Sequence, residues 1–221
     1  MTARHPGSGR ARAHAVPPGA ADCGRLSAMS RSSAGAEPRT VRIGRVRVVI
    51  APPEEPPFRF DAEVVEEDTY LVLSAGPEAI ESDVHPLRVL QAAHDARPVA
   101  PGSVVAQPGP PLRLLAVVHD LAQEPTWREE WIAEALAAVM REVRKRQVRA
   151  LTLPVLGARH GRMPAAAFAG LLRRALEAET PPSLARLWIR AAGEIEDMAA
   201  VLKAGRGAGG VLRRGPWPGS G

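Results

Sequence analysis

Residues 151–176 read LTLPVLGARHGRMPAAAFAGLLRRAL, and this stretch decides the fold class. It opens with a short apolar run of strand length, and Gly157 and Gly161 punctuate its middle. Pro164 stands where a helix can begin without losing a hydrogen bond. Apolar residues then recur at helical spacing: Phe168, Leu171, Leu172, Ala175 and Leu176. The stretch predicts a buried strand, a glycine-containing loop and an amphipathic helix.

The loop between that strand and that helix is a candidate anion site. Free backbone N–H groups and the positive end of the helix dipole converge there, an arrangement that suits a phosphate. Arg159, His160 and Arg162 add positive charge. An ordinary strand-to-helix turn with solvated arginines has the same pattern, so the loop taken alone favours that simpler interpretation.

The neighbouring segments place this loop in a larger pattern. Two apolar strands joined by a Pro/Gly turn are expected within residues 102–121, a long amphipathic helix begins at Trp127, and another strand is expected at residues 184–191. The alternation of strands and helices from Leu114 onward favours parallel strands. We therefore expect a three-layer α/β/α sandwich with a mixed, mostly parallel central sheet and helices on both faces. Its earlier strands are predicted at residues 41–51, 58–65 and 69–73.

The order of these predicted elements and the motifs within them resemble the macro domain family over roughly residues 41–203. The matches are Gly102–Val105, Leu115–His119, and Pro154–Gly157 with Gly161 and Pro164, which resembles the family's PxLG-x-x-x-G-x-x-P loop. Weaker matches are Leu71–Gly76, where the family has its IVNAAN strand, and Gln91–His94, which resembles the family's xAAG.

The resemblance implies that two loops flank a bound ADP-ribose. In that family the first loop supplies the distal ribose contacts and, in hydrolytic members, a catalytic Asn, while the second cradles the diphosphate. The expected ligand-binding residues of the first loop are Ser74, Ala75, Gly76, Asp83 and Val84. Those of the second loop are Gly157, Ala158, Arg159, His160, Gly161, Arg162 and Met163.

The chain departs from the family pattern where chemistry is expected. Ser74 and Pro77 stand at the two Asn positions of NAAN, Glu81–Asp83 replace a glycine triplet, and Arg159 stands at a glycine. Carboxylates repel an anionic ligand, and Arg159 would crowd the loop unless its side chain turned away. The family's early GDI motif has no match, and Glu54 and Glu55 lie nearest to its place.

We therefore expect binding of ADP-ribose or a related nucleotide diphosphate without efficient hydrolysis. A degenerate macro fold that has lost the ligand and acts as a protein-interaction module is the alternative, and an ADP-ribosyl hydrolase comes third.

No metal and no cofactor are expected. His85, His119 and His160 show neither H-x-x-x-H nor paired Cys/His spacing. Ser74 with Asp83 and His85 could be interpreted as a nucleophilic triad, but the G-x-S-x-G turn that exposes such a serine is missing.

The long helix has sequence signals at both ends. Thr126 and Glu129 form an S/T-x-x-E capping box, which predicts its start. Its last turns hold Arg141, Arg144, Lys145 and Arg146. We interpret these cations as complementing the helix dipole and not as a basic binding patch.

Positive charge is concentrated at the two ends of the chain. The whole chain carries +5, and residues 1–40 and 203–221 carry +4 each, which leaves −3 for residues 41–202. A nucleic-acid footprint on the folded part is therefore not expected, although the ends could bind phosphate backbones weakly and without sequence preference. Their composition predicts disordered tails at residues 1–40 and 204–221 around a domain at residues 41–203.

The remaining composition bears on location. The only cysteine, Cys23, excludes an intramolecular disulfide. No apolar run approaches the ~20 residues needed to span a membrane, and the N-terminus lacks the apolar stretch of a signal peptide. We expect a cytoplasmic protein without membrane contact.

Overall fold

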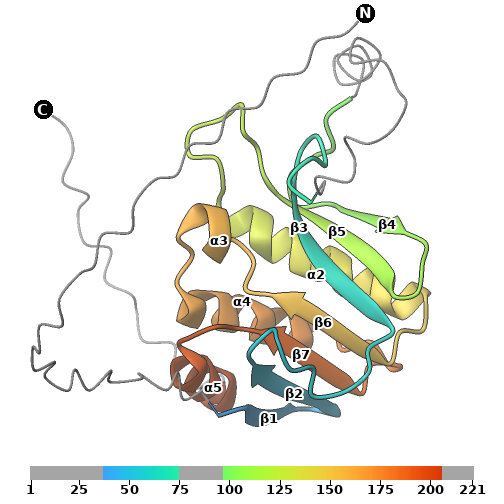
Figure 1. Cartoon of the computed structure of the whole chain (residues 1–221), viewed down its shortest axis with the longest axis vertical. Helices are drawn as coiled ribbons and strands as arrows, with labels where there is room; N and C mark the ends of the chain where they lie inside the picture. The colour runs from blue at the N-terminus through green and yellow to red at the C-terminus, as the bar shows by residue number, and fades with distance from the viewer. Residues whose placement is uncertain (1–36, 75–96, 206–221) are drawn as a thin grey trace, which may run out of the picture. The chain divides into compact units, whose positions relative to one another are not determined.

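The computed structural model describes residues 37–74 and 97–205, and these residues build a seven-stranded sheet in the order β1-β2-β7-β6-β3-β5-β4 (Figure 1). The strands are β1 (Arg39–Ile43), β2 (Val46–Ala51), β3 (Ala62–Asp68), β4 (Val104–Gln107), β5 (Leu112–His119), β6 (Ala150–Pro154) and β7 (Arg186–Arg190). The five inner strands run parallel, and the edge strands β1 and β4 are antiparallel to their neighbours. The predicted α/β class with a mixed, mostly parallel sheet is confirmed.

The described helices are α2 (Glu129–Lys145), the single turn α3 (Ala158–Gly161), α4 (Ala165–Ala178) and α5 (Ile195–Lys203). The long helices α2, α4 and α5 pack on one face of the sheet, where they form the main hydrophobic core. Its fully buried side chains include Ile50, Leu114, Ile132, Leu136, Leu153 and Phe168. None of these helices is both long and apolar enough to cross a bilayer.

The second face of the sheet carries a smaller aromatic cluster. Phe58 and Phe60, from the connection between β2 and β3, pack against Val49, Ala51 and Trp188. The Phe60 and Trp188 ring centroids lie 6.0 Å apart. The sequence predicts helices on both faces of the sheet. Residues 37–74 and 97–205 form no helix on this second face, so that part of the expectation stays a prediction.

The predicted strand at residues 41–51 is a hairpin of two strands. Gly44 adopts a φ of 55°, a left-handed conformation that costs glycine little, and the chain turns there between β1 and β2. The strand β1 buries Val41 and Ile43, and β2 buries all of its residues except Arg47, so apolar residues stand on both sides of the turn and hide the break.

The strands predicted at residues 58–65 and 69–73 are replaced by the single strand β3. After Asp68 the chain turns, and the side chains of Tyr70 and Val72 are 46% and 54% exposed. The match of Leu71–Ser74 to the family's IVNAAN strand is therefore wrong, since β3 ends at Asp68, before this segment begins. The rest of that match and Gln91–His94 lie outside the described residues.

The capping box predicted at Thr126 is also wrong. Helix α2 begins at Glu129, its N-cap residue is Arg128, and no side chain caps it. Trp127 instead forms an isolated β-bridge with His119, and the Thr126 carbonyl accepts the N–H of Asp120. Because residues 126 and 127 are engaged in these pairings, the helix begins only at Glu129.

Asp61 provides a stability test, because it ties three strand starts together. Its carboxylate accepts the N–H groups of Arg149 and Ala150 at 3.0 and 2.9 Å, and its backbone carbonyl accepts the N–H of Leu112. Asp61→Ala should cost about 1–2 kcal/mol in the free energy of unfolding, since two N–H groups lose a charged acceptor. Chemical denaturation measures this cost. Thr126→Ala is the control and should stay within about 0.5 kcal/mol of wild type.

Candidate functional site

The loop after β6 has the strand–loop–helix form that the sequence predicts. Gly157 adopts a left-handed φ of 77°, the turn α3 follows, and Arg162 is again left-handed with a φ of 57°. The N–H of Met163 then donates to the carbonyl of Gly157 at 3.0 Å, which closes the loop before Pro164 leads into α4. The loop is thus held by its own backbone.

Only glycine fits at position 157. A Cβ built there would lie 2.6 Å from Ile132 Cδ1, on α2, and 3.1 Å from Met163 Cβ. The positive φ adds a second reason, since side chains other than glycine rarely adopt it. The loop is therefore packed tightly against the helix behind it.

The first N–H group of this loop donates to a carboxylate of the protein itself. The N–H of Gly157 donates to Oε2 of Glu66 at 3.0 Å, and Oε1 of the same carboxylate lies 2.5 Å from Nε2 of the buried His119. Glu66 belongs to β3 and His119 ends β5. One carboxylate therefore links two strands and the loop.

A second carboxylate lies at the start of α4. The N–H of Ala165 donates to Oε2 of Glu194 at 3.3 Å. Glu194 comes from the connection between β7 and α5, where it adopts a left-handed φ of 53°. A negative charge at a helix N-terminus is stabilised by the exposed N–H groups and the helix dipole. Both anion-accepting features foreseen for a diphosphate thus have an internal carboxylate partner.

The other two acids at the end of β3 shape the next turn. The Asp68 carboxylate accepts the N–H of Tyr70 at 2.7 Å and that of Val72 at 3.3 Å. The Glu67 carboxylate accepts the N–H of Leu73 at 3.0 Å and the N–H and Oγ–H of Ser74. The Ser74 hydroxyl is therefore already bonded to a buried acid, and the other members of the nucleophilic triad considered above lie outside the described residues.

Two adjoining hollows lie at the carboxyl ends of β6 and β7. The larger, about 640 Å³, is lined by Ala158, Arg162, Met163, Ala165 and Glu194 among others. The smaller, about 470 Å³, is lined by Glu66, Ser74, Arg113 and Arg159 among others. They share Pro154, Arg190 and Ala192. Together they have the size and place of a ligand cleft in an open α/β sheet.

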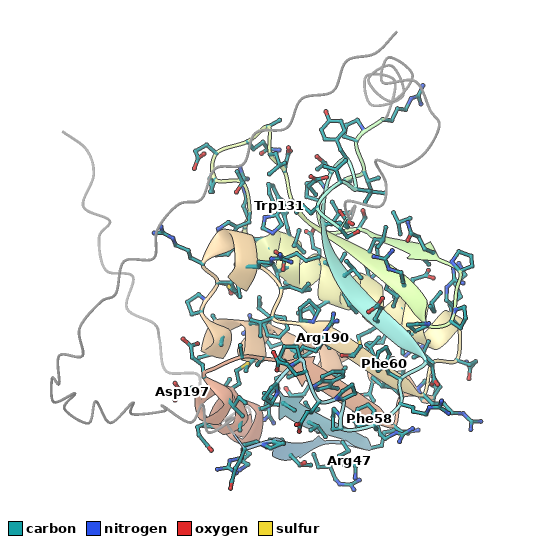
Figure 2. The ribbon with its side chains drawn as sticks, viewed as in Figure 1. Arg47, Phe58, Phe60, Trp131, Arg190 and Asp197 are labelled. Carbon is teal, nitrogen blue, oxygen red and sulfur yellow. The ribbon has the colours of Figure 1, made fainter. Side chains whose placement is uncertain are left out.

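Arg190, which ends β7, lies between the two hollows, and Figure 2 shows it over the central strands. Its Nη2 donates to the Val64 carbonyl at 2.9 Å, and its Nη1 lies 3.7 Å from the Glu63 carboxylate, which also pairs with Arg113. Its Nε is buried and has no partner among the described residues. Burial lowers the pKa of Arg190, and Glu63 opposes this shift. The guanidinium is thus incompletely compensated beside an open cleft.

The structure brings four of the seven predicted residues of the second loop to this cleft, together with Ser74 of the first. Ala158, Arg162 and Met163 line the larger hollow, and Arg159 lines the smaller one together with Ser74 of the first loop. Gly157 lies buried beneath them. The side chains at positions 160 and 161 are not among those described. Ala75, Gly76, Asp83 and Val84 lie outside the described residues, so their expected roles stay predictions.

Sequence reasoning missed Arg190, Glu66 and Glu194. The run Glu66–Asp68 was a usable signal, because three consecutive acids at the end of a predicted strand need polar partners, and Glu67 and Asp68 are indeed buried. Arg190 and Glu194 had no comparable local signal. Within the described part of the chain, no group of three or more His, Cys, Asp or Glu side chains is placed to hold a metal ion.

The sheet order, the loop after β6 and the cleft beside it define the fold as that of a macro domain. No family model and no curated protein matches the sequence, and the likeness is to solved structures. The Oceanobacillus iheyensis macrodomain with MES bound superposes with a TM-score of 0.54 at 12% identity, over 75% of this chain and 93% of that chain.

Two further structures of the same bacterial protein give similar values. A variant of it with ADPR has a TM-score of 0.54 at 14% identity, over 75% of this chain and 95% of that chain. The structure with ADP has a TM-score of 0.53 at 13% identity, over 75% of this chain and 93% of that chain. At these identities the likeness shows the fold alone.

A glycine pair tests how rigidly this loop is held. Gly157→Ala should destabilise the protein by about 2–4 kcal/mol, because a strained φ and a close contact with Ile132 act together. Gly193→Ala, in the connection after β7, is the matched control, since its Cβ would meet no atom within 4 Å. Denaturant titration of both variants measures the difference. Equal stability of the two would contradict the packed geometry of position 157.

Proposed function

We propose that the cleft formed by the two hollows binds ADP-ribose or a related nucleotide diphosphate, without efficient hydrolysis. Supporting this proposal, the fold is that of macrodomains, and among the similar structures one contains ADPR and another ADP. The cleft also lies at the carboxyl ends of parallel strands, where open α/β sheets bind ligands.

The observation that carries the proposal is the position of Arg190. Its guanidinium is shared by both hollows and has a buried Nε without a described partner. Arg159 and Arg162 line the same cleft from the loop above. Arginine presents a planar fork of donors that matches phosphate oxygens, so these cations suit a diphosphate lying across the two hollows.

The expected lack of hydrolysis follows from the residue types available. The resemblance assigns hydrolysis to a catalytic Asn, and none of the 221 positions of this chain is Asn. The carboxylates near the cleft do not replace it, because Glu66 and Glu67 are engaged with backbone N–H groups and with His119 or Ser74. Acting as a base would require each to give up those bonds.

Glu66 and Glu194 are also the observation that favours the alternative function. Their carboxylates hold the N–H groups of Gly157 and Ala165, so the chain supplies its own anions where a ligand phosphate is expected. A macro fold completed in this way could serve as a protein-interaction module that needs no nucleotide. Titration calorimetry with ADP-ribose separates the two functions, since the first requires saturable heat and the second predicts none.

Arg190→Gln tests the cation assigned to the diphosphate. Loss of a charge-assisted hydrogen bond worth about 1.5–3 kcal/mol should weaken ADP-ribose binding by about tenfold to a hundredfold. Calorimetry measures the affinity, and a thermal melt checks that the variant is still folded despite losing the bond to Val64. A folded variant that binds as tightly as wild type would remove Arg190 from the site.

Glu194→Gln tests the competing carboxylate. Removing a negative charge beside the N-terminus of α4 should tighten binding of an anionic ligand by about two- to fivefold, the range expected for a charge at a helix end. Asp197→Asn is the matched control, because Asp197 is an exposed acid in the first turn of α5 that lines neither hollow. Equal effects of the two substitutions would mean that only the overall charge matters.

A further inference from the structure

Three arginines form a row across the end of the sheet that lies farthest from the cleft. In the strand register, Arg42 of β1 is directly opposite Arg47 of β2, and Arg47 is directly opposite Arg186 of β7. Neighbouring strands are about 4.8 Å apart, so the row spans about 10 Å. Arg186 begins β7 and Arg190 ends it, which separates this arginine row from the proposed ligand cleft.

The arginine row has no ion-pair partner among residues 37–74 and 97–205. No described carboxylate forms an ion pair with Arg42, Arg47 or Arg186. Like charges directly opposite each other on neighbouring strands destabilise a sheet. The arrangement therefore carries a cost that folding alone does not explain.

At the C-terminal end of α2, clustered cations have carboxylate partners. Arg144 pairs with Glu179, and Lys145 and Arg146 pair with Glu142. Each of these three cations contacts a carboxylate of the protein, although Glu142 is shared by two of them and Arg141 has no ion pair among the described residues. The arginine row differs in lacking such contacts within the described part of the chain, although residues 41–202 as a whole are net negative.

The side chains of the row are presented to solvent. Arg42 and Arg47 are exposed, and Arg186 is half-buried with its guanidinium carbon 5.0 Å from the centroid of the Phe58 ring. Figure 2 shows Arg47 and Phe58 beside β2 and apart from Arg190. Stacking on Phe58 restrains the half-buried cation, which lowers the entropic cost of using it in binding.

Two more arginines extend the positive surface at this end. Arg45 lies exposed in the turn between β1 and β2. Arg149 is exposed just before β6, and its carbonyl accepts the N–H of Arg186. Arginines thus lie along the same end of the sheet, from the hairpin between β1 and β2 to the start of β6.

We propose that this arginine row binds the phosphate backbone of a nucleic-acid strand without sequence preference. Several cations in a line suit a regularly charged polymer better than a single phosphate, and guanidinium groups pair well with phosphate oxygens. A lipid surface fits less well, because the exposed large apolar side chains among the described residues are Tyr70, Val72 and Leu121. These follow β3 and β5 at the opposite end of the strands.

The test uses the full chain and a fluorescein-labelled 20-nucleotide oligothymidylate, with fluorescence anisotropy measured from 50 to 200 mM salt. Arg42→Gln/Arg47→Gln is compared with Arg97→Gln/Arg141→Gln, a control that removes the same charge from exposed sites with no ion pair among the described residues. Both ends of the chain are present in every protein, so their own contribution cancels.

The row variant should bind more weakly than wild type, and the slope of log affinity against log salt should become shallower by about 1.4, from ~0.7 for each of two lost phosphate contacts. The wild-type advantage should then shrink about sevenfold over this fourfold range of salt. The control should keep the wild-type slope. The melting temperature of the row variant should be equal to or above that of wild type, because facing charges are removed.

Three results would overturn the proposal. They are a wild-type protein that does not bind the oligonucleotide, a control that loses as much as the row variant, and binding to phosphatidylserine vesicles without binding to the oligonucleotide. ADP-ribose calorimetry on the row variant should match wild type, which keeps this surface distinct from the cleft.

Discussion

The geometry of the cleft depends on the contacts that the Glu66 carboxylate makes. This carboxylate accepts the N–H of Gly157 and contacts His119, and so joins β3, the end of β5 and the loop after β6 in one buried polar contact. Losing either partner would remove one contact of a part-buried carboxylate and so cost stability. The left-handed backbone of Gly157 and its close approach to Ile132 occur at the same residue that donates to Glu66.

This constraint changes which groups are available to a ligand. A loop that has committed its first N–H to an internal acid cannot offer that group to a phosphate. The start of α4 is in the same position because of Glu194, although that acid is exposed and reaches the helix from a connecting segment. The cations that line the cleft, Arg159, Arg162 and Arg190, must then supply most of the attraction for an anion. Recognition in this chain is accordingly proposed to depend on side chains more than on backbone.

The sequence predicted the parts of the site that are local. Residues 151–176 contain a strand, a loop and a helix because apolar spacing, Gly157 and Pro164 all act within a few positions, and α4 begins one residue after Pro164. It failed where the outcome depends on specific pairings that apolar spacing does not show. Thr126 lost its capping role to a bridge between Trp127 and His119, and the strand expected at residues 69–73 lost to a turn held by Asp68. Glu194 and Arg190 meet the cleft only because β7 lies beside β6, which no local pattern reveals.

The cleft and the arginine row differ in how their charges are arranged, and this difference constrains what each can bind. Around the cleft, acids and arginines are interleaved, and Glu63, near the start of β3, contacts both Arg113 and Arg190. Such a mixed site selects a ligand by geometry, because net charge gives it little long-range pull. At the other end the facing arginines are uniform in sign, which gives attraction at a distance with little selectivity. A net charge averaged over residues 41–202 conceals this division, because it sums over the very residues that the sheet register separates.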